Sequence, residues 1–242
     1  MLPLDHFLRS SKCVVAAALS ALAVQLRASE GQPVGSATLD LATAYLFRGA
    51  TVTDTYVAQP SLKAEILPSL TIGVWGNMDL DSDGGRYRTR EFSEVDLTAS
   101  YAIPIERPSL SLGYVEYLYP HSDIGPDREL FVSAGVDVLL HPTVTGYWGV
   151  DGAVHRELYA EVSIAHSFDL AEGLALDLSA VLAGRYSDRR ETGLSHAVLA
   201  AALRYGVVKA GVAWVPVLDR DVLPDDVHNT EVVGTLSFNV DF

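Results

Sequence analysis

Two serine–histidine pairs are the residues in this sequence whose types could do covalent chemistry. His121 precedes Ser122, and Ser195 precedes His196. A serine nucleophile needs a histidine base within hydrogen-bond reach and a third group that orients the histidine. Adjacent residues on a strand point to opposite faces, which weakens a direct dyad in either pair. We therefore predict that the protein is not an enzyme.

The stretch DLDSDGG superficially resembles the start of a calcium-binding loop. Asp79, Asp81 and Asp83 precede Gly84 at the spacing of such a loop. A calcium loop of this kind carries a glutamate at its twelfth position, where this chain has Arg90, and it lies between two helices. We predict no metal site and no cofactor. The stretch is interpreted as a solvated loop that could contact divalent cations bridging lipopolysaccharide.

Composition narrows the class of protein. The chain has 242 residues, of which 49% are hydrophobic and 20% charged, with a formal net charge of −14. An acidic chain without a basic stripe lacks the surface that binds phosphates, so nucleic acid is excluded as a partner. The length suits one β-barrel domain.

The N-terminus has the pattern of an export signal. Two basic residues precede the apolar run 13–24, which is too short to span a bilayer. Cleavage could follow Ala23 or Ala28, and we prefer Ala28. The prediction is a signal peptide over 1–28 and one domain over 29–242, with no cysteine in the mature chain.

Strict alternation of apolar and polar residues dominates the rest of the chain. In 69–80, for example, Leu70, Ile72, Val74 and Met78 share one face of a strand. No stretch approaches the 18 apolar residues of a transmembrane helix, whereas about ten alternating residues suffice for a tilted membrane strand. Twelve such runs are found: 37–48, 56–67, 69–80, 92–103, 108–119, 128–140, 142–150, 156–168, 173–186, 195–205, 207–217 and 230–242.

The connections between these runs alternate between short and long. The short ones include IERPS, HP, DLAEG and YG; the longer, more polar ones include 49–55, 81–91, 120–127, 187–194 and 218–229. Outer-membrane barrels have short periplasmic turns and long external loops. We predict an all-β, antiparallel transmembrane barrel of about twelve strands in a Gram-negative outer membrane, with both termini in the periplasm.

Aromatic residues at the ends of the runs predict two girdles at the lipid interfaces. The expected outer girdle contains Tyr45, Phe47 and Tyr186, and the expected inner girdle contains Tyr101, Phe168, Tyr205 and Phe242.

The C-terminal residues GTLSFNVDF alternate up to the last residue. A barrel in lipid must pair its last strand with its first, because lipid cannot satisfy an open strand edge. The pattern also resembles the signal read by the barrel-assembly machinery, which we expect to bind the chain together with periplasmic chaperones. The residues of this signal are Gly234, Leu236, Phe238, Val240 and Phe242.

Three segments carry a resemblance to a known family. They are TAYLFRGATVTDTYVAQPSL (43–62), GVWGNMDL (73–80) and FSEVDLTASYAI (92–103). An opening strand that ends Tyr-x-Phe-Arg-Gly, then Trp-Gly-Asn and Glu-x-Asp-Leu, resembles the TorF-like family of outer-membrane porins. The resemblance covers roughly residues 38–103, and it implies a small diffusion pore.

The polar faces of the twelve runs predict a hydrated, net negative lumen. We predict passive diffusion of small hydrophilic solutes or ions; the alternative is a non-conducting structural or adhesive barrel that acts through its external loops. Outer-membrane lipid and lipopolysaccharide are the expected surroundings. The acidic candidates are Asp40, Glu65, Glu94, Asp96, Glu129, Asp137, Glu157, Glu161, Asp177, Glu231 and Asp241, and the basic ones are Arg48, Lys63, Arg185, Arg204 and Lys209.

Overall fold

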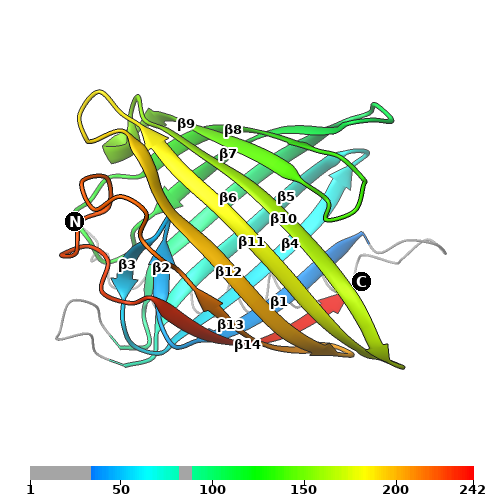
Figure 1. Ribbon diagram of the computed structural model, residues 1–242. Helices are drawn as coiled ribbons and strands as arrows, with labels where there is room; N and C mark the ends of the chain where they lie inside the picture. Colours follow the sequence, from blue (N-terminus) through cyan, green and yellow to red (C-terminus); the bar gives the residue numbers. More distant parts are fainter. Residues whose placement is uncertain (1–33, 82–88) are drawn as a thin grey trace, which may run out of the picture.

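In the computed structural model, which describes residues 34–81 and 89–242, twelve strands close into a single antiparallel barrel (Figure 1). Around the ring the order is β1, β14, β13 and so on down to β4, which pairs with β1 again. The predicted fold class is confirmed. The signal peptide predicted over 1–28 and the centre of the predicted loop 81–91 lie outside the described residues. The barrel strands are β1 (Gly35–Ala42), β4 (Val57–Leu67), β5 (Leu70–Asp79), β6 (Phe92–Ile103), β7 (Ser109–Leu118), β8 (Asp127–Gly135), β9 (Thr143–Asp151), β10 (Leu158–Ala171), β11 (Leu174–Tyr186), β12 (Gly193–Tyr205), β13 (Val208–Trp214) and β14 (Val232–Asp241).

Two further strands, β2 (Tyr45–Phe47) and β3 (Ala50–Thr53), form a separate hairpin, and η1 (Gly152–Val154) is a single 3₁₀ turn. Within the described part of the chain, no helix is long and apolar enough to cross a membrane.

The first and last strands close the barrel. β1 pairs with β14 over seven positions, from Ser36 opposite Asp241 to Ala42 opposite Thr235. The carbonyl oxygen of Phe242 accepts a hydrogen bond from the Gly35 amide at 2.9 Å, and the Phe242 amide donates to the Gly35 carbonyl at 3.0 Å. The terminal residue therefore belongs to the wall, which satisfies the edge that lipid could not.

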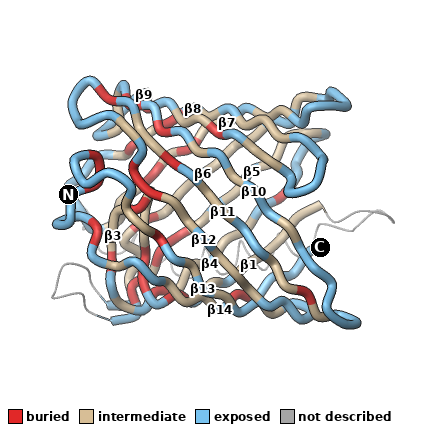
Figure 2. The backbone as a smooth tube through the Cα atoms, viewed as in Figure 1, coloured by how far each residue is buried: buried red, intermediate tan, exposed pale blue. Residues whose placement is uncertain are grey.

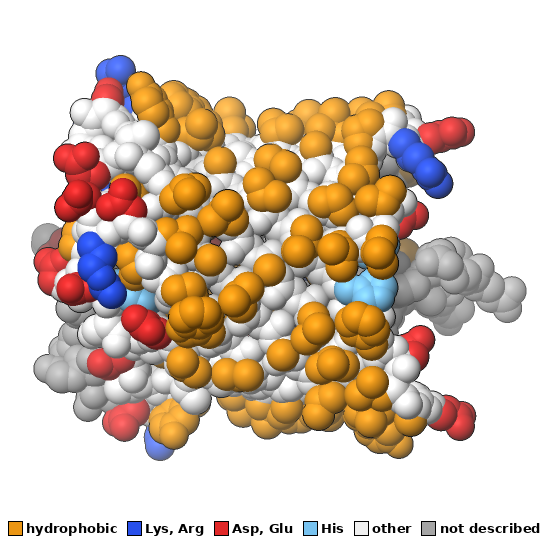
Figure 3. Space-filling model, in the orientation of Figure 1, with side chains coloured by type: hydrophobic (Ala, Val, Ile, Leu, Met, Phe, Trp, Pro, Cys, Tyr) orange, Lys and Arg blue, Asp and Glu red, His pale blue; other side chains and the backbone are white. Residues whose placement is uncertain are grey.

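The outer face of the barrel is apolar. Side chains such as Leu97, Val132, Leu199 and Leu203 are about half exposed, and Figure 3 shows hydrophobic side chains spread over the wall with charged side chains gathered at its two ends. The predicted girdle residues Tyr101, Phe168, Tyr186 and Tyr205 are among the exposed aromatics. Exposed apolar residues over a whole wall are what a lipid-facing barrel requires.

The first predicted strand, 37–48, is wrong in its second half. β1 ends at Ala42, and the chain then turns into the β2–β3 hairpin. Tyr45 and Phe47 are therefore absent from the outer girdle: Tyr45 is 6% exposed and its hydroxyl donates to Glu94 Oε2 at 2.9 Å. Their spacing suits a lipid-facing strand, but the rings pack against the inside of the barrel.

The predicted strand 128–140 is also too long. β8 ends at Gly135, and residues 136–142 form a turn closed by a hydrogen bond from the Val136 amide to the Pro142 carbonyl at 3.1 Å. Asp137, predicted to face the lumen, lies in this turn with its side chain 77% exposed and 3.2 Å from His141 Nδ1. The alternation continues past the point where the backbone leaves the sheet.

Three smaller corrections concern strand ends. Glu157 precedes β10 and Glu231 precedes β14, so neither is a strand residue. β13 ends at Trp214 instead of residue 217. The proline at position 216 has no amide hydrogen to donate to a ladder.

Buried residues gather at the end of the barrel that holds the β2–β3 hairpin (Figure 2). This end carries the long connections, including 187–192 and 215–231, and we call it the loop end. The opposite end is called the turn end. It carries the connections 104–108 and 172–173, the beginning of β1 and the end of β14. The interior of the barrel is therefore most closely packed toward the loop end.

Candidate functional site

The strand register separates the wall into two faces. Residues directly opposite each other on antiparallel strands point to the same face of the sheet. The pairs Asp40–Gln59, Lys63–Gly73 and Asp96–Tyr117 therefore all belong to one face, which can be followed from strand to strand around the barrel. Asp40, Asp177 and Lys209 line a cavity inside the barrel, which identifies this set as the inward face. The predicted lumen residues that belong to it are Asp40, Lys63, Glu65, Glu94, Asp96, Glu129, Glu161, Asp177, Arg185, Arg204, Lys209 and Asp241.

The lumen at the turn end is open and mixed in charge. Its cavity has a volume of about 650 Å³. Arg204 Nε lies 3.2 Å from Asp177 Oδ2, and Ser167 Oγ donates to Asp177 Oδ1 at 2.6 Å. Lys209 and Asp40 face the same space. A hydrated chamber of this size has room for a small solute.

The β2–β3 hairpin narrows the lumen at the loop end. Tyr45 packs against Trp75 of β5 with ring centroids 5.4 Å apart, and its hydroxyl donates to Glu94 of β6. Thr53 Oγ1 donates to Asp79 Oδ1 at 2.7 Å, and both residues are fully buried. These contacts fasten the hairpin to the β4–β6 wall from inside.

The tip of the hairpin contacts β8 of the barrel wall through Arg48. Arg48 has φ 52° and Gly49 has φ 83°, so the tip turns through the left-handed region that glycine adopts without strain. Arg48 Nη1 donates to Glu129 Oε1 at 2.8 Å, and Nη2 donates to Glu129 Oε2 at 2.5 Å. The two parallel bonds are the bidentate geometry of a strong guanidinium–carboxylate pair.

Aromatic rings surround the same guanidinium. Its Cζ atom lies 4.3 Å from the ring centroid of Tyr159, 5.0 Å from that of Tyr147 and 4.9 Å from that of Phe47. Each ring of a desolvated cation–π pair contributes roughly 0.5–2 kcal/mol. Burial by itself lowers the pKa of Arg48, but the hydrogen bond and the charge of Glu129 outweigh it, so the pKa is raised and the side chain stays charged.

A second cavity lies beside the hairpin tip. It has a volume of about 390 Å³, and its wall includes Arg48, Tyr147, Tyr159, Glu161 and His196. Valine side chains of β11, β12 and the segment after β13 also line it, together with Tyr117 of β7 and further residues of the hairpin. The space joins apolar, aromatic and charged surfaces at the level of the hairpin tip.

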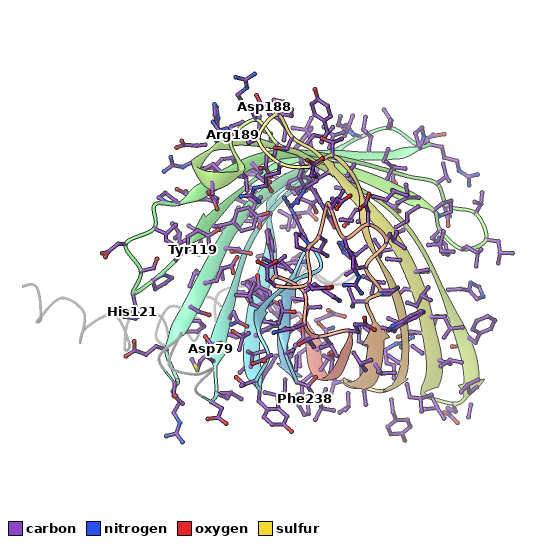
Figure 4. All side chains as sticks on the ribbon, turned by 60° about the vertical axis from the view of Figure 1, so that its left-hand side comes forward. Asp79, Tyr119, His121, Asp188, Arg189 and Phe238 are labelled. Atoms are coloured by element: carbon purple, nitrogen blue, oxygen red, sulfur yellow. The ribbon has the colours of Figure 1, made fainter. Side chains whose placement is uncertain are left out.

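The segment 215–231 forms hydrogen bonds with the hairpin at the loop end. The Thr51 amide donates to the Val227 carbonyl at 2.7 Å, and His228 Nδ1 lies within hydrogen-bond distance of the Gly49 carbonyl. Arg185 of β11 donates to the Val222 carbonyl of the same segment. Figure 4 shows this segment in the mouth at the loop end, with Asp188 and Arg189 on the rim. Hairpin and segment together constrict the mouth.

Ser195 and His196 form a contact that alternation argued against. A register shift between Ala183 and Gly184 of β11 interrupts the ladder beside them, and Ser195 Oγ lies 3.0 Å from His196 Nδ1. Ser195 Oγ also donates to the Ala183 carbonyl at 3.3 Å. The single hydroxyl hydrogen of Ser195 can be donated to the Ala183 carbonyl or to His196 Nδ1, but not to both at once. No group of three potential metal ligands occurs among residues 34–81 and 89–242.

The sequence reasoning missed the tyrosines of the constriction. Tyr117, Tyr147 and Tyr159 stand on the inward face beside the predicted carboxylates. Their period-two positions would have assigned them to the lumen had aromatic residues been included with the charged ones. Arg48 was predicted to face the lumen as a wall residue; its side chain does lie inside, but it comes from the hairpin tip.

Comparisons with known proteins agree with the barrel. A family model described as "Bacterial protein of unknown function (Gcw_chp)" matches residues 28–145, which end early in β9. No curated protein matches the sequence. The first half of the chain is thus similar to a bacterial family whose function is unknown.

Solved structures with similar folds are membrane barrels. A chain from a study of in-meso crystallization of membrane proteins is 11% identical, with a TM-score of 0.52 and coverage of 86% of this chain and 83% of that one. The NanC porin is 14% identical, with a TM-score of 0.51 and coverage of 84% and 98%. The COG4313 outer-membrane channel from Pseudomonas putida F1 is 10% identical, with a TM-score of 0.49 and coverage of 88% and 97%. At these identities the likeness concerns the fold alone.

Proposed function

We propose that the protein is a narrow channel of the bacterial outer membrane through which small hydrophilic solutes or ions diffuse passively. The observation that carries the proposal is the inward face, which bears charged residues along its length and encloses cavities of about 650 Å³ and 390 Å³. A barrel with a purely structural role has no need of a hydrated charged interior. The TorF-like resemblance of residues 38–103 and the porin fold of a structural neighbour support the same function.

We infer that the loop end is external and that the turn end, where β1 begins and β14 ends, faces the periplasm. The difference in connection length supports this orientation. Lipopolysaccharide would then surround the loop end. The assembly machinery would meet the last strand, whose Leu236, Phe238 and Val240 face outward (Figure 4 labels Phe238).

Selectivity follows from the residues at the constriction. Glu94, Asp96, Glu129 and Glu161 face the lumen there, and the Arg48 charge is paired with Glu129. A narrow low-dielectric tube concentrates the field of its lining charges, so an acidic excess enriches cations. We expect weak cation selectivity that fades as salt shortens the screening length.

One observation favours the alternative function, a barrel that does not conduct. The hairpin and segment 215–231 occupy the mouth and hydrogen-bond to each other, so a permanently closed barrel would use its loops as an adhesive or structural surface.

Single-channel recording of the refolded protein in planar bilayers separates the two functions. The matched variant replaces residues 43–56 by an Asn-Gly turn between Ala42 and Val57, which are already paired in the sheet. We expect small conductance steps for the wild type and larger steps for the variant. Steps in the variant alone would favour the closed barrel, and silence in both would contradict the channel.

A further inference from the structure

We propose that Tyr117, Glu129, Tyr147 and Tyr159 form a binding site for guanidinium-bearing solutes, and that Arg48 of the chain itself occupies it in this structure. We call these four residues the guanidinium cage. The proposal deepens the channel function, on which it rests, by naming the chemical class of solute that the constriction recognises.

The cage is complete on the barrel wall without the hairpin. Its four residues come from four consecutive strands, β7 to β10, and face the lumen together. Tyr117 OH donates to Glu129 Oε2 at 2.9 Å, which fixes the carboxylate that receives the guanidinium. Tyr147 and Tyr159 lie 6.1 Å apart as neighbouring rings. The wall therefore presents a fixed carboxylate between ring faces.

This arrangement matches a guanidinium better than an ammonium. Two parallel N–H groups meet the two oxygens of Glu129 at 2.8 and 2.5 Å, and a further one points to Tyr117 OH at 3.4 Å. The planar ion also lies near the faces of two wall tyrosines. A rigid fork with flat faces is the property that separates arginine from lysine.

A cavity beside the cage has room for a solute. The cavity of about 390 Å³ adjoins Arg48 and both ring tyrosines, and it continues past Glu161 along valine side chains. Glu161 accepts one hydrogen bond, from Tyr159 OH at 3.3 Å, and forms no ion pair with any residue in the described ranges. Its carboxylate can attract a cation toward the cage, while the valines accept an aliphatic stem.

Arg48 competes with an incoming solute for the cage. Arg48 reaches the cage from a hairpin that is anchored at its base by Tyr45 and Thr53. An incoming guanidinium must displace this tethered group, whose effective concentration is at least of the order of millimolar. Removal of the Arg48 side chain should therefore uncover the site.

The test measures binding of methylguanidinium to the refolded barrel in detergent micelles by NMR titration. We expect Arg48→Ala to bind it at least about tenfold more tightly than the wild type, because the tethered competitor is gone. In the same variant, methylammonium should bind about tenfold more weakly than methylguanidinium, because a point charge cannot form the paired hydrogen bonds.

The matched control is Arg190→Ala. Arg190 also pairs with a shielded glutamate at the loop end, with its Nε 3.3 Å from Glu157 Oε1, but it does not touch the cage. This variant should bind methylguanidinium like the wild type. Equal affinities for Arg48→Ala and the wild type, or for the two probe cations, would overturn the proposal.

Arg48→Ala leaves Glu129 buried without its cation and could prevent folding, so a second variant is needed. Arg48→Lys keeps a cation beside Glu129 but lacks the fork, and we expect it to bind methylguanidinium more tightly than the wild type. Heat-modifiable migration in SDS gels reports that each barrel is closed. Binding in micelles requires no current, so a silent bilayer would contradict the channel while leaving the cage intact.

Discussion

Arginine substitutions at adjacent positions of β12 measure both the membrane embedding and the register of the barrel. Leu199 lies six residues from each end of β12, is 47% exposed and faces outward. Six residues at ~3.3 Å each span ~20 Å, or ~14 Å along the membrane normal at a tilt of about 45°. That distance is about half of the ~25 Å apolar band of such barrels, so Leu199 lies near the bilayer midplane. Leu199→Arg should therefore cost about 2–4 kcal/mol of folding free energy.

The neighbouring position is the matched control. Ala200 faces inward and lines the cavity of about 650 Å³, where an arginine finds water and the carboxylate of Asp177. We expect Ala200→Arg to change the folding free energy by less than about 1 kcal/mol. Tyr205→Arg, at the interface end of the same strand, should cost about 0–1 kcal/mol.

Urea titration of folding into phospholipid vesicles, followed by tryptophan emission, gives the three free energies. A difference of 2–4 kcal/mol corresponds to roughly 30- to 700-fold in the folding equilibrium, since each 1.4 kcal/mol is about tenfold. Equal costs at positions 199 and 200, or a larger cost at 200, would refute the lipid-facing assignment of this wall.

Three further outcomes test the assembly, orientation and selectivity. Deletion of Phe242, or its replacement by glutamate, should lower the amount of SDS-resistant barrel in the membrane without altering the conductance of barrels that form; normal membrane levels would contradict its role in assembly. A glutamate-specific protease added to intact cells should cut at Glu191 in the connection 187–192 and spare Glu106 in the turn 104–108; cleavage at Glu106 would reverse the orientation. The double variant Glu94→Gln with Asp96→Asn should reduce the cation preference read from the reversal potential in a tenfold KCl gradient, because it replaces two lumenal carboxyl groups by neutral amides. Clear anion selectivity of the wild type would refute the proposed sign of the field.

The strands and their faces could be predicted because a membrane barrel repeats one local rule. Side chains alternate with a period of two, and one face must be apolar over the whole wall. Asp177 and Arg204, for example, lie on β11 and β12 on either side of the long connection 187–192, yet parity alone assigns both to the lumen, where they form an ion pair.

The hairpin could not be predicted from the same rule. Tyr45 and Phe47 continue the parity of Leu39 and Leu41, so a ring that packs on Trp75 looks identical in the sequence to a ring in lipid. The contact between Ser195 and His196 lies at a bulge in β12, where the pairing with β11 skips Ser195, and the apolar–polar alternation does not record such a bulge. Segments that pack inside the barrel, and bulges in its strands, depend on partners distant in the sequence.

Because Ala42 pairs with Val57, the hairpin is an insertion that the sheet does not need for its continuity. β1 and β4 are in register up to these two residues, so the sheet continues as though residues 43–56 were absent. Insertions at such a junction cost the wall little, because loop closure depends only weakly on length. Exchange of this single internal segment could thus change the solute that the barrel accepts, while every strand of the wall stays the same.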